Sequence, residues 1–223
     1  MSDARDERKV AVSVTEVAAW LRDRIRLGRV VPGQRLIEAE IMREVGASRS
    51  RVREAIQRLE GEGLVIIEEF RGASVRSFTD DEIRQIYRAR MVLEGLAAHD
   101  FAVALDPERK ADLARLQEGM NALEHSSDHP GFARLNDQWH DVIIEGAGND
   151  YVRTFVDRLR LPLYRLLFTA FYKPHRIDDA NADHRRITAA ILAGDGTEAE
   201  SLMRQHLSDA LTAVSNLEES FRH

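Results

Sequence analysis

One stretch of the chain, residues 46–65, constrains the fold more than any other. Four of its apolar residues recur at the spacing of a single helix face: Val52, Ala55, Ile56 and Leu59. Ser48 stands where a helix N-cap is expected. From residue 48 to residue 58 there is one acidic residue, Glu54, against four basic ones: Arg49, Arg51, Arg53 and Arg58. The pattern predicts a helix that docks on a small core and presents arginines on its other side. Such a face suits a phosphate-walled groove, and a solvated charged surface is the alternative.

The residues around this helix predict a winged helix-turn-helix. Downstream, glycines end the helix, and a β-branched run at residues 64–67 predicts a buried strand. The chain then turns into a second strand at residues 73–76, which completes a β-hairpin. Upstream, apolar periodicity predicts helices over residues 14–27 and 38–45. Two helices, a turn, a third helix and a hairpin are the order of elements in a winged helix-turn-helix.

The motifs in this region also carry a family resemblance. The chain reads Ser-Arg-Ser-Arg-Val-Arg-Glu-Ala-Ile at residues 48–56 and Leu-Glu-Gly-Glu-Gly-Leu at residues 59–64. This resembles the recognition segment of the GntR family of bacterial transcription regulators. The resemblance implies that the helix and the tip of the hairpin contact DNA, with these candidate residues: Ser48, Arg49, Ser50, Arg51, Arg53, Arg71 and Gly72. Arg51 replaces the usual proline and Ala39 replaces a common arginine, so the operator is expected to differ from those of well-known relatives.

Charge divides the chain into two parts. Residues 1–78 carry 15 basic and 13 acidic side chains, whereas residues 79–223 carry 17 and 25, so the net charge of -6 comes from the second part. An acidic C-terminal part is repelled by DNA and leaves DNA binding to the first part. A capping box, Thr79 with Glu82, opens a long helix at the start of the second part. We therefore expect two domains, residues 1–78 and 79–223, with a short connection.

The second part is expected to be entirely helical. Six helices are predicted, at residues 80–104, 107–125, 131–146, 150–172, 176–193 and 197–220. Pro162 is expected to kink the fourth helix, and a second capping box, Thr197 with Glu200, is expected to open the sixth. Because the connections are short, the helices are expected to form an antiparallel bundle. The predicted fold class is mostly α, with an N-terminal winged helix-turn-helix and a C-terminal six-helix bundle.

Histidines in the predicted bundle form a second group of interest. Asn136 and His140 lie four residues apart, so both side chains point the same way from one helix. His184 and His206 each lie 11 residues from Asp195, in the turn between the last two helices. In an antiparallel pair, equal distances from the turn, about 16 Å along each helix, place two residues at one height. Three imidazoles converge if these two also face inward. The alternative is that the histidines are only solvated or hydrogen-bonded.

The motifs around these histidines resemble the FCD effector domain of the FadR subfamily of GntR regulators, and six helices resemble its VanR-type branch. The motifs lie at residues 136–140, 183–187 and 203–206. The resemblance implies a metal held by Asn136, His140, His184 and His206. With nitrogen and oxygen ligands and no cysteine in the chain, Zn²⁺ is the first choice, and Ni²⁺, Mn²⁺ and Fe²⁺ are alternatives. Asn136 replaces the commoner aspartate, and the neighbouring Asp137 is the substitute ligand to check.

Open coordination positions on such a metal suit a small carboxylate metabolite as effector. Arg90 is the candidate partner for that carboxylate. An ion pair with Glu94, four residues further along the same helix, is the alternative role for Arg90.

These features predict a homodimeric, metabolite-responsive repressor that binds a palindromic DNA operator, because a two-fold dimer places two recognition helices on symmetric half-sites. The chain has no apolar run long enough to span a membrane and no signal-peptide core at its start, so a cytoplasmic location is expected. A metal-dependent hydrolase could use the same histidines, but the chain has no common hydrolase motif. A DNA-binding dimer with a degenerate, metal-free pocket is the other alternative.

Overall fold

The computed structural model describes residues 12–26, 28–160 and 174–221. Its internal contacts divide the chain into two compact units, Met1–Ser77 and Phe78–His223. No helix within the described ranges is both long and apolar enough to cross a membrane.

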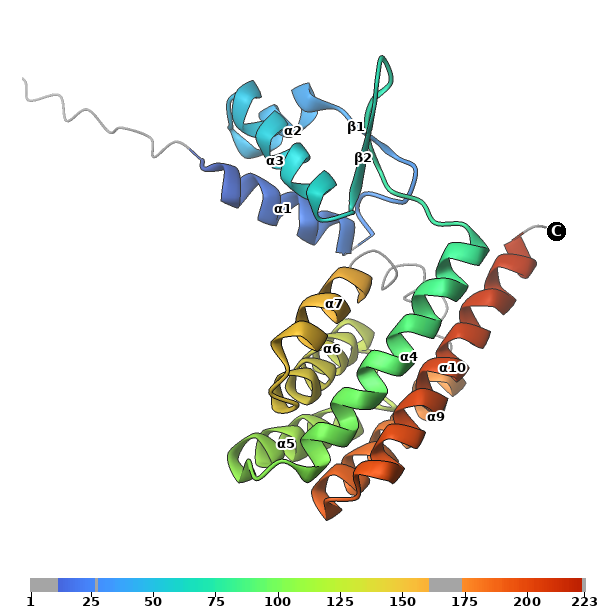
Figure 1. Ribbon diagram of the computed structural model, residues 1–223. Coiled ribbons are helices and arrows are strands. Elements are labelled where there is room, and N and C mark those ends of the chain that lie inside the picture. Colours follow the sequence, from blue (N-terminus) through green and yellow to red (C-terminus); the bar gives the residue numbers. More distant parts are fainter. Residues whose placement is uncertain (1–11, 27, 161–173, 222–223) are drawn as a thin grey trace, which may run out of the picture. The chain divides into compact units, whose positions relative to one another are not determined.

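The N-terminal unit is a winged helix-turn-helix, as predicted. Its described helices are α1 (Val14–Arg26), α2 (Glu38–Val45) and α3 (Arg49–Gly61), and its strands are β1 (Arg35–Leu36), β2 (Val65–Glu68) and β3 (Gly72–Val75). The strands form an antiparallel sheet in the order β1-β3-β2, so β3 is central. In Figure 1 the hairpin of β2 and β3 projects away from the helices of this unit as the wing.

The apolar face of α3 positions this helix, as the sequence predicts. Its four inward residues are buried, and Val52 and Leu59 have no exposed surface. They pack α3 against α1, α2 and β2. Full burial of one such aliphatic side chain stabilises a fold by about 1.5–3 kcal/mol. This docking fixes the rotation of α3 about its axis and keeps the arginine face outward.

Two local predictions hold only in part in this unit: Ser48 occupies the N-cap position without a capping hydrogen bond, and the predicted strand is buried over half its length. Ser48 does precede α3, but its hydroxyl lies 3.1 Å from Oγ of Ser50 and caps no backbone N–H group. The strand at residues 64–67 is buried only at Leu64 and Val65, and the two isoleucines that follow are each 39% exposed. β2 is an edge strand that runs outward into the wing beyond Val65, so no layer covers its last residues.

The described residues of the C-terminal unit form helices only. They are α4 (Asp80–Val103), α5 (Pro107–Leu123), α6 (His129–Gly146), α7 (Asp150–Arg160), α9 (Pro174–Ala193) and α10 (Gly196–Phe221). α10 packs along α4, and α6, α7 and α9 also contact α4. α5 lies against α6 and α9. The central position of α4 agrees with its burial, which includes the fully covered Tyr87 and Phe101.

The start of α4 confirms the predicted capping box. Oγ1 of Thr79 accepts a hydrogen bond from the Glu82 amide at 3.2 Å, and Oε2 of Glu82 accepts one from the Thr79 amide at 2.9 Å. The second predicted capping box, at Thr197 and Glu200, is wrong. α10 begins one residue earlier, and Oδ1 of Asp195 accepts from the Glu198 amide at 3.0 Å.

The predicted helix boundaries otherwise lie within two residues of the described ones, with the fourth helix as the exception. The prediction extends that helix to residue 172, and the structure describes α7 as far as Arg160. The expected kink at Pro162 lies outside the described residues.

Candidate DNA-binding surface and metal site

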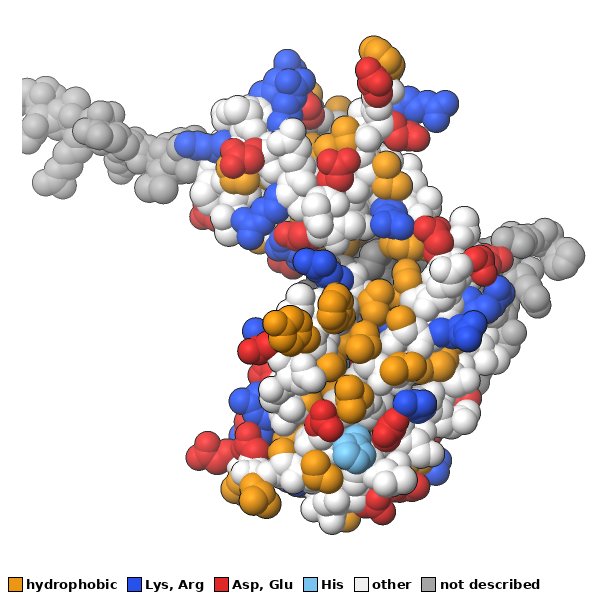
Figure 2. Space-filling model, in the orientation of Figure 1, with side chains coloured by type: hydrophobic (Ala, Val, Ile, Leu, Met, Phe, Trp, Pro, Cys, Tyr) orange, Lys and Arg blue, Asp and Glu red, His pale blue; other side chains and the backbone are white. Residues whose placement is uncertain are grey.

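The outer face of α3 carries the arginines that the sequence predicts for DNA contact. The side chains of Arg49 and Arg53 are 63% and 62% exposed, and Arg51 is half-buried. Ser48 and Ser50 are exposed at the start of the same helix. Figure 2 shows basic side chains gathered on the N-terminal unit over α2 and α3. The structure therefore brings the predicted residues of α3 to one accessible end of the helix.

One carboxylate on α2 holds both exposed arginines. Oε1 of Glu38 accepts a hydrogen bond from Nε of Arg53 at 2.7 Å, and its Oε2 lies 3.5 Å from Nε of Arg49. A guanidinium has five N–H donors in a rigid fork, so contact at Nε leaves the terminal nitrogens as the groups that lead outward. Glu38 thus restrains both arginines. The sequence analysis missed this role, although Glu38 begins a helix that was correctly predicted.

The wing tip combines an apolar, an acidic and a basic side chain. Arg71 is exposed and lies 3.8 Å from Glu68, and its carbonyl accepts a hydrogen bond from Arg35 at 2.5 Å. Gly72 has a φ of 82°, a left-handed conformation that favours glycine. Phe70 was not predicted as a site residue, yet it is 97% exposed and has a φ of 63°. A phenylalanine in this region is strained, and the space-filling view shows apolar and charged groups together at the tip (Figure 2).

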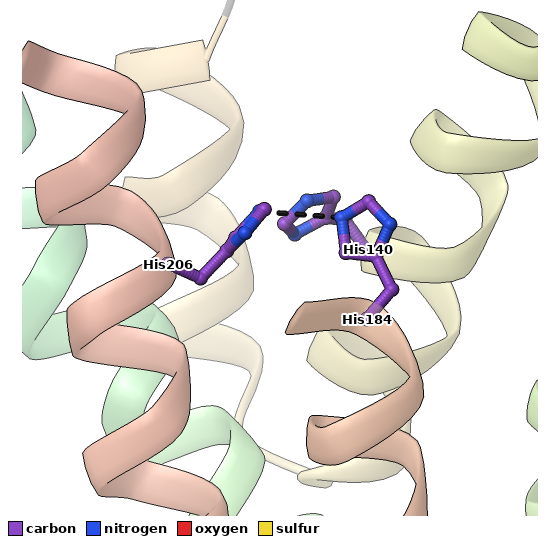
Figure 3. Close-up of side chains that lie close together, drawn as sticks. All are labelled: His140, His184 and His206. Carbon is purple, nitrogen blue, oxygen red and sulfur yellow. Dashed lines mark hydrogen bonds between the residues drawn. The ribbon is translucent and has the colours of Figure 1, made fainter. Parts of the chain in front are cut away.

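Three histidines from separate helices meet inside the C-terminal unit. His140 comes from α6, His184 from α9 and His206 from α10, and one ring nitrogen of each lies within 4.8 Å of the others. Figure 3 shows the three rings pointing toward one another. The Nε2 atoms of His184 and His206 are 3.2 Å apart. Two nitrogens about 2.1 Å from one metal ion, at tetrahedral or octahedral angles, are separated by about 3.0–3.4 Å. The spacing therefore fits two ligands of a single ion.

Burial disfavours a positive charge on His184. His184 has no exposed surface, and burial lowers its pKa well below the ordinary value of 6.5. The nearby His206, His140 and Arg185 lower that pKa further, because a positive charge on His184 would be repelled by theirs. Trp139 packs on the ring of His184 with 4.6 Å between ring centroids, and its indole N–H donates to Thr188 at 2.9 Å. A neutral imidazole keeps the lone pair that a metal requires.

Carboxylates lie behind two of the three rings. Oε2 of Glu94 is 3.1 Å from Nδ1 of His140, and Oδ2 of Asp183 is 3.5 Å from Nδ1 of His206. A carboxylate on Nδ1 favours the tautomer that is protonated there and leaves the Nε2 lone pair for a metal. Both rings are therefore arranged to offer Nε2 to the centre of the cluster.

The other predicted site residues of this unit have different surroundings. Arg90 is buried on α4, and its Nε donates to Glu94 at 2.7 Å, which is the ion pair that the sequence offered as its alternative role. Asn136 is half-buried one turn before His140 on α6, and its role as a ligand stays a prediction. Asp137 is not part of the histidine cluster.

A partly open cavity of about 340 Å³ reaches His206 from the surface. The described residues that line it are Asp179, Ala180, Ala182, Asp183, His206, Asp209, Ala210 and Thr212. Three carboxylates and no lysine or arginine occur among these residues. The resulting negative potential favours the approach of a cation to the histidines and opposes a free anion.

Comparison with known proteins agrees with both units. Residues 13–75 match the bacterial regulatory proteins of the gntR family, and residues 85–209 match the FCD domain. The chain is 27% identical over 202 residues to the transcriptional repressor GlaR of Escherichia coli, covering 84% of this chain and 89% of GlaR. It is 34% identical over 148 residues to an HTH-type transcriptional regulator of Agrobacterium vitis, covering 65% of this chain and 86% of that regulator.

A solved structure resembles most of the chain. The crystal structure of a GntR regulator from Rhodococcus sp. RHA1 has a TM-score of 0.77 and 27% identity, covering 91% of this chain and 97% of that chain. Proteins of this kind regulate transcription and are not enzymes, in agreement with the prediction from sequence. The chain belongs to the GntR family of bacterial transcription regulators and carries an FCD domain after its winged helix-turn-helix.

Proposed function

We propose that the protein is a homodimeric repressor that binds a palindromic operator through α3 and the wing, and that its C-terminal unit holds a metal and a small carboxylate effector. The observation that carries the DNA-binding part is the outward pair Arg49 and Arg53 on a helix docked by its other face. In this proposal these arginines reach base edges in the major groove. Ser48, Ser50 and Arg51 contact the backbone beside them, and Arg71 and Gly72 bring the wing to the neighbouring groove.

An exposed apolar surface on the C-terminal unit supports a dimer. Figure 2 shows apolar side chains gathered over α4 and α7. The large exposed ones are Val92, Leu96 and Val103 on α4, and Tyr151 and Phe155 on α7. A contiguous apolar surface of this kind is typical of protein interfaces. A second copy of the chain joined through the C-terminal unit would give the assembly the two-fold symmetry that a palindromic operator requires.

Removal of the recognition arginines tests the DNA-binding assignment. The substitutions Arg49→Ala and Arg53→Ala should each weaken operator binding by about 1–3 kcal/mol per half-site, since each removes a bidentate base contact. Arg58→Ala is the matched control, because it removes the same charge near the other end of α3, where Arg58 pairs with Glu62. The measurement is a titration of an operator selected from promoter fragments, with two chains expected per duplex. Normal binding by the double variant Arg49→Ala/Arg53→Ala would disprove the assignment.

The histidine cluster supports the metal. Domains of the FCD family are known to bind metals, and the buried His140, His184 and His206 are a possible site in this chain. Three imidazole ligands suit Zn²⁺ best, with Ni²⁺, Mn²⁺ and Fe²⁺ as alternatives. Asn136 is proposed as a fourth ligand through its amide oxygen. A neutral amide in place of a carboxylate removes one negative charge from the site and lowers its affinity for a divalent ion.

Metal analysis of the purified protein tests this site. About one transition metal per chain is expected, as structural and catalytic zinc sites hold a single ion between three or four ligands. The double variant His140→Ala/His206→Ala should lose it, whereas His125→Ala, which removes an exposed histidine outside the cluster, should keep it. A metal-free wild type with intact operator binding would instead favour a dimer with a degenerate pocket.

The lowered pKa of His184 predicts a pH dependence of stability in the metal-free protein. Below about pH 6.5 the histidine of the unfolded chain takes up a proton that the folded chain does not, so stability falls as the pH falls. One such group contributes at most about 1.4 kcal/mol per pH unit. Urea unfolding with a chelator present, at pH 5.5 and 7.5, should show a smaller pH effect in His184→Gln than in wild type. His125→Gln should leave the effect unchanged, and an equal effect in all three proteins would contradict the assignment.

The acidic cavity restricts how a carboxylate effector binds. Asp179, Asp183 and Asp209 repel a free carboxylate, so the charge of a bound metal has to attract it. The predicted contact between Arg90 and the effector would use guanidinium nitrogens other than Nε, which donates to Glu94.

Thermal-shift measurements with and without metal test the effector. Representative sugar acids, hydroxy acids and dicarboxylates should raise the melting temperature of metal-loaded protein only. An acid that binds should then change operator affinity, and the operator should change the affinity for that acid by the same factor. Equal stabilisation of the metal-free variant His184→Ala would show that the metal does not receive the acid.

A further inference from the structure

Arg90 and Glu94 form a buried ion pair at the centre of the C-terminal unit. Their side chains are 3% and 1% exposed, and Nε of Arg90 donates to Oε1 of Glu94 at 2.7 Å. Both residues lie on α4, one turn apart, and the guanidinium also lies over the ring of Tyr87 at 5.1 Å. Replacing a buried ion pair by apolar side chains of similar volume is often neutral or stabilising. Stability alone therefore does not account for the pair.

The second oxygen of Glu94 leads to the histidine cluster. Oε2 lies 3.1 Å from Nδ1 of His140, on α6, whose side chain is also buried. The geometry is that of a close contact and not of a straight hydrogen bond. In the arrangement inferred below, the imidazole turns so that its N–H group points at the carboxylate. A chain of three side chains thus connects α4 with a nitrogen-rich centre built from α6, α9 and α10.

We infer that Glu94, held in place by Arg90, is a positioning residue that orients His140 for the metal and ties the metal to α4. The inference rests on the proposed metal site. Nδ1–H of His140 donates to Glu94, and Nε2 offers its lone pair to the metal. The negative charge of Glu94 makes the imidazole a stronger ligand, because it stabilises the positive charge that the ring gains on coordination. The hydrogen bond from Arg90 fixes the direction of the carboxylate.

Glu94 is better suited to this role than Asp183 is. Asp183 stands 3.5 Å from Nδ1 of His206, and its side chain is 24% exposed at the edge of the cavity. Solvent screens an exposed carboxylate, whereas a fully buried one acts through a medium of low polarity. The influence of Glu94 on its histidine is therefore stronger.

Because Glu94 belongs to α4, a metal at the cluster also acts on that helix. Rotation of His140 onto the metal draws the Glu94 carboxylate with it, and α4 carries that carboxylate. α4 contacts α6, α7, α9 and α10, and it begins at Asp80, five residues after β3 ends at Val75. The contact between Glu94 and His140 is thus a polar link from the histidines to the helix that follows the wing in the chain.

Zn²⁺ affinity of the full-length protein, measured by competition with a chelator, tests the inference. Glu94→Gln keeps the shape of the side chain and removes its charge, and it should weaken Zn²⁺ binding about tenfold to a hundredfold. Phe101→Leu is the control, because it disturbs a fully buried position on the same helix away from the histidines. It should lower the melting temperature and leave Zn²⁺ affinity unchanged.

A second variant separates a loss of Zn²⁺ binding from misfolding of Glu94→Gln. Arg90→Met/Glu94→Leu removes the whole pair and leaves no unpaired buried charge, so it should fold as stably as wild type and still bind Zn²⁺ weakly. Wild-type Zn²⁺ affinity in both variants would overturn the inference, provided that His140→Ala abolishes binding. If the wild type itself binds no Zn²⁺, the proposed metal site and this inference are both wrong.

Discussion

The C-terminal unit depends on placing three imidazoles in an apolar core. His140, His184 and His206 are buried among Trp139, Ile143 and other core residues, and burial lowers the pKa of His184 well below its ordinary value. Neutral rings have lone pairs that need donors, and the 3.2 Å contact between His184 and His206 supplies only one proton for two facing nitrogens. The proposed metal ion at the centre would satisfy all three rings together. The same contact sets the approach of α9 and α10.

The N-terminal unit uses charge differently because its charges are exposed. Glu38 holds Arg49 and Arg53 at the surface, where an ion pair contributes about 0–1 kcal/mol and yields readily to a competing phosphate. In the proposed DNA complex its value would be orientation, since two guanidiniums that are already restrained need less ordering when they meet a base edge. Glu94 performs the corresponding task for a metal ligand, but in the interior, where removing one partner is costly. The difference between the two carboxylates is their burial. An exposed carboxylate holds its arginines weakly, whereas a buried one is costly to remove.

Sequence patterns predicted the features that depend on a single helix or on two helices joined by a short turn. The buried face of α3 and the capping box at Thr79 follow from residues a few positions apart. The meeting of His184 and His206 followed from their equal distance to Asp195, which holds for any antiparallel helix pair. The failed capping box at Thr197 shows the limit of such reasoning, because Asp195, two residues earlier, caps the helix through the Glu198 amide and no spacing rule decides between the two starts.

The sequence could not predict contacts between residues of different helices that no short turn or helical repeat relates. Arg90 and Glu94 were recognisable as a pair four residues apart, but only the packing of α4 against α6 brings Glu94 to His140. An apolar pair of the same volume would fill this space equally well and would leave Nδ1 of His140 facing hydrocarbon. The ring would then be free to present either nitrogen to the cluster. A carboxylate at this position selects one tautomer, and it can be buried there because an arginine one turn away on the same helix balances its charge.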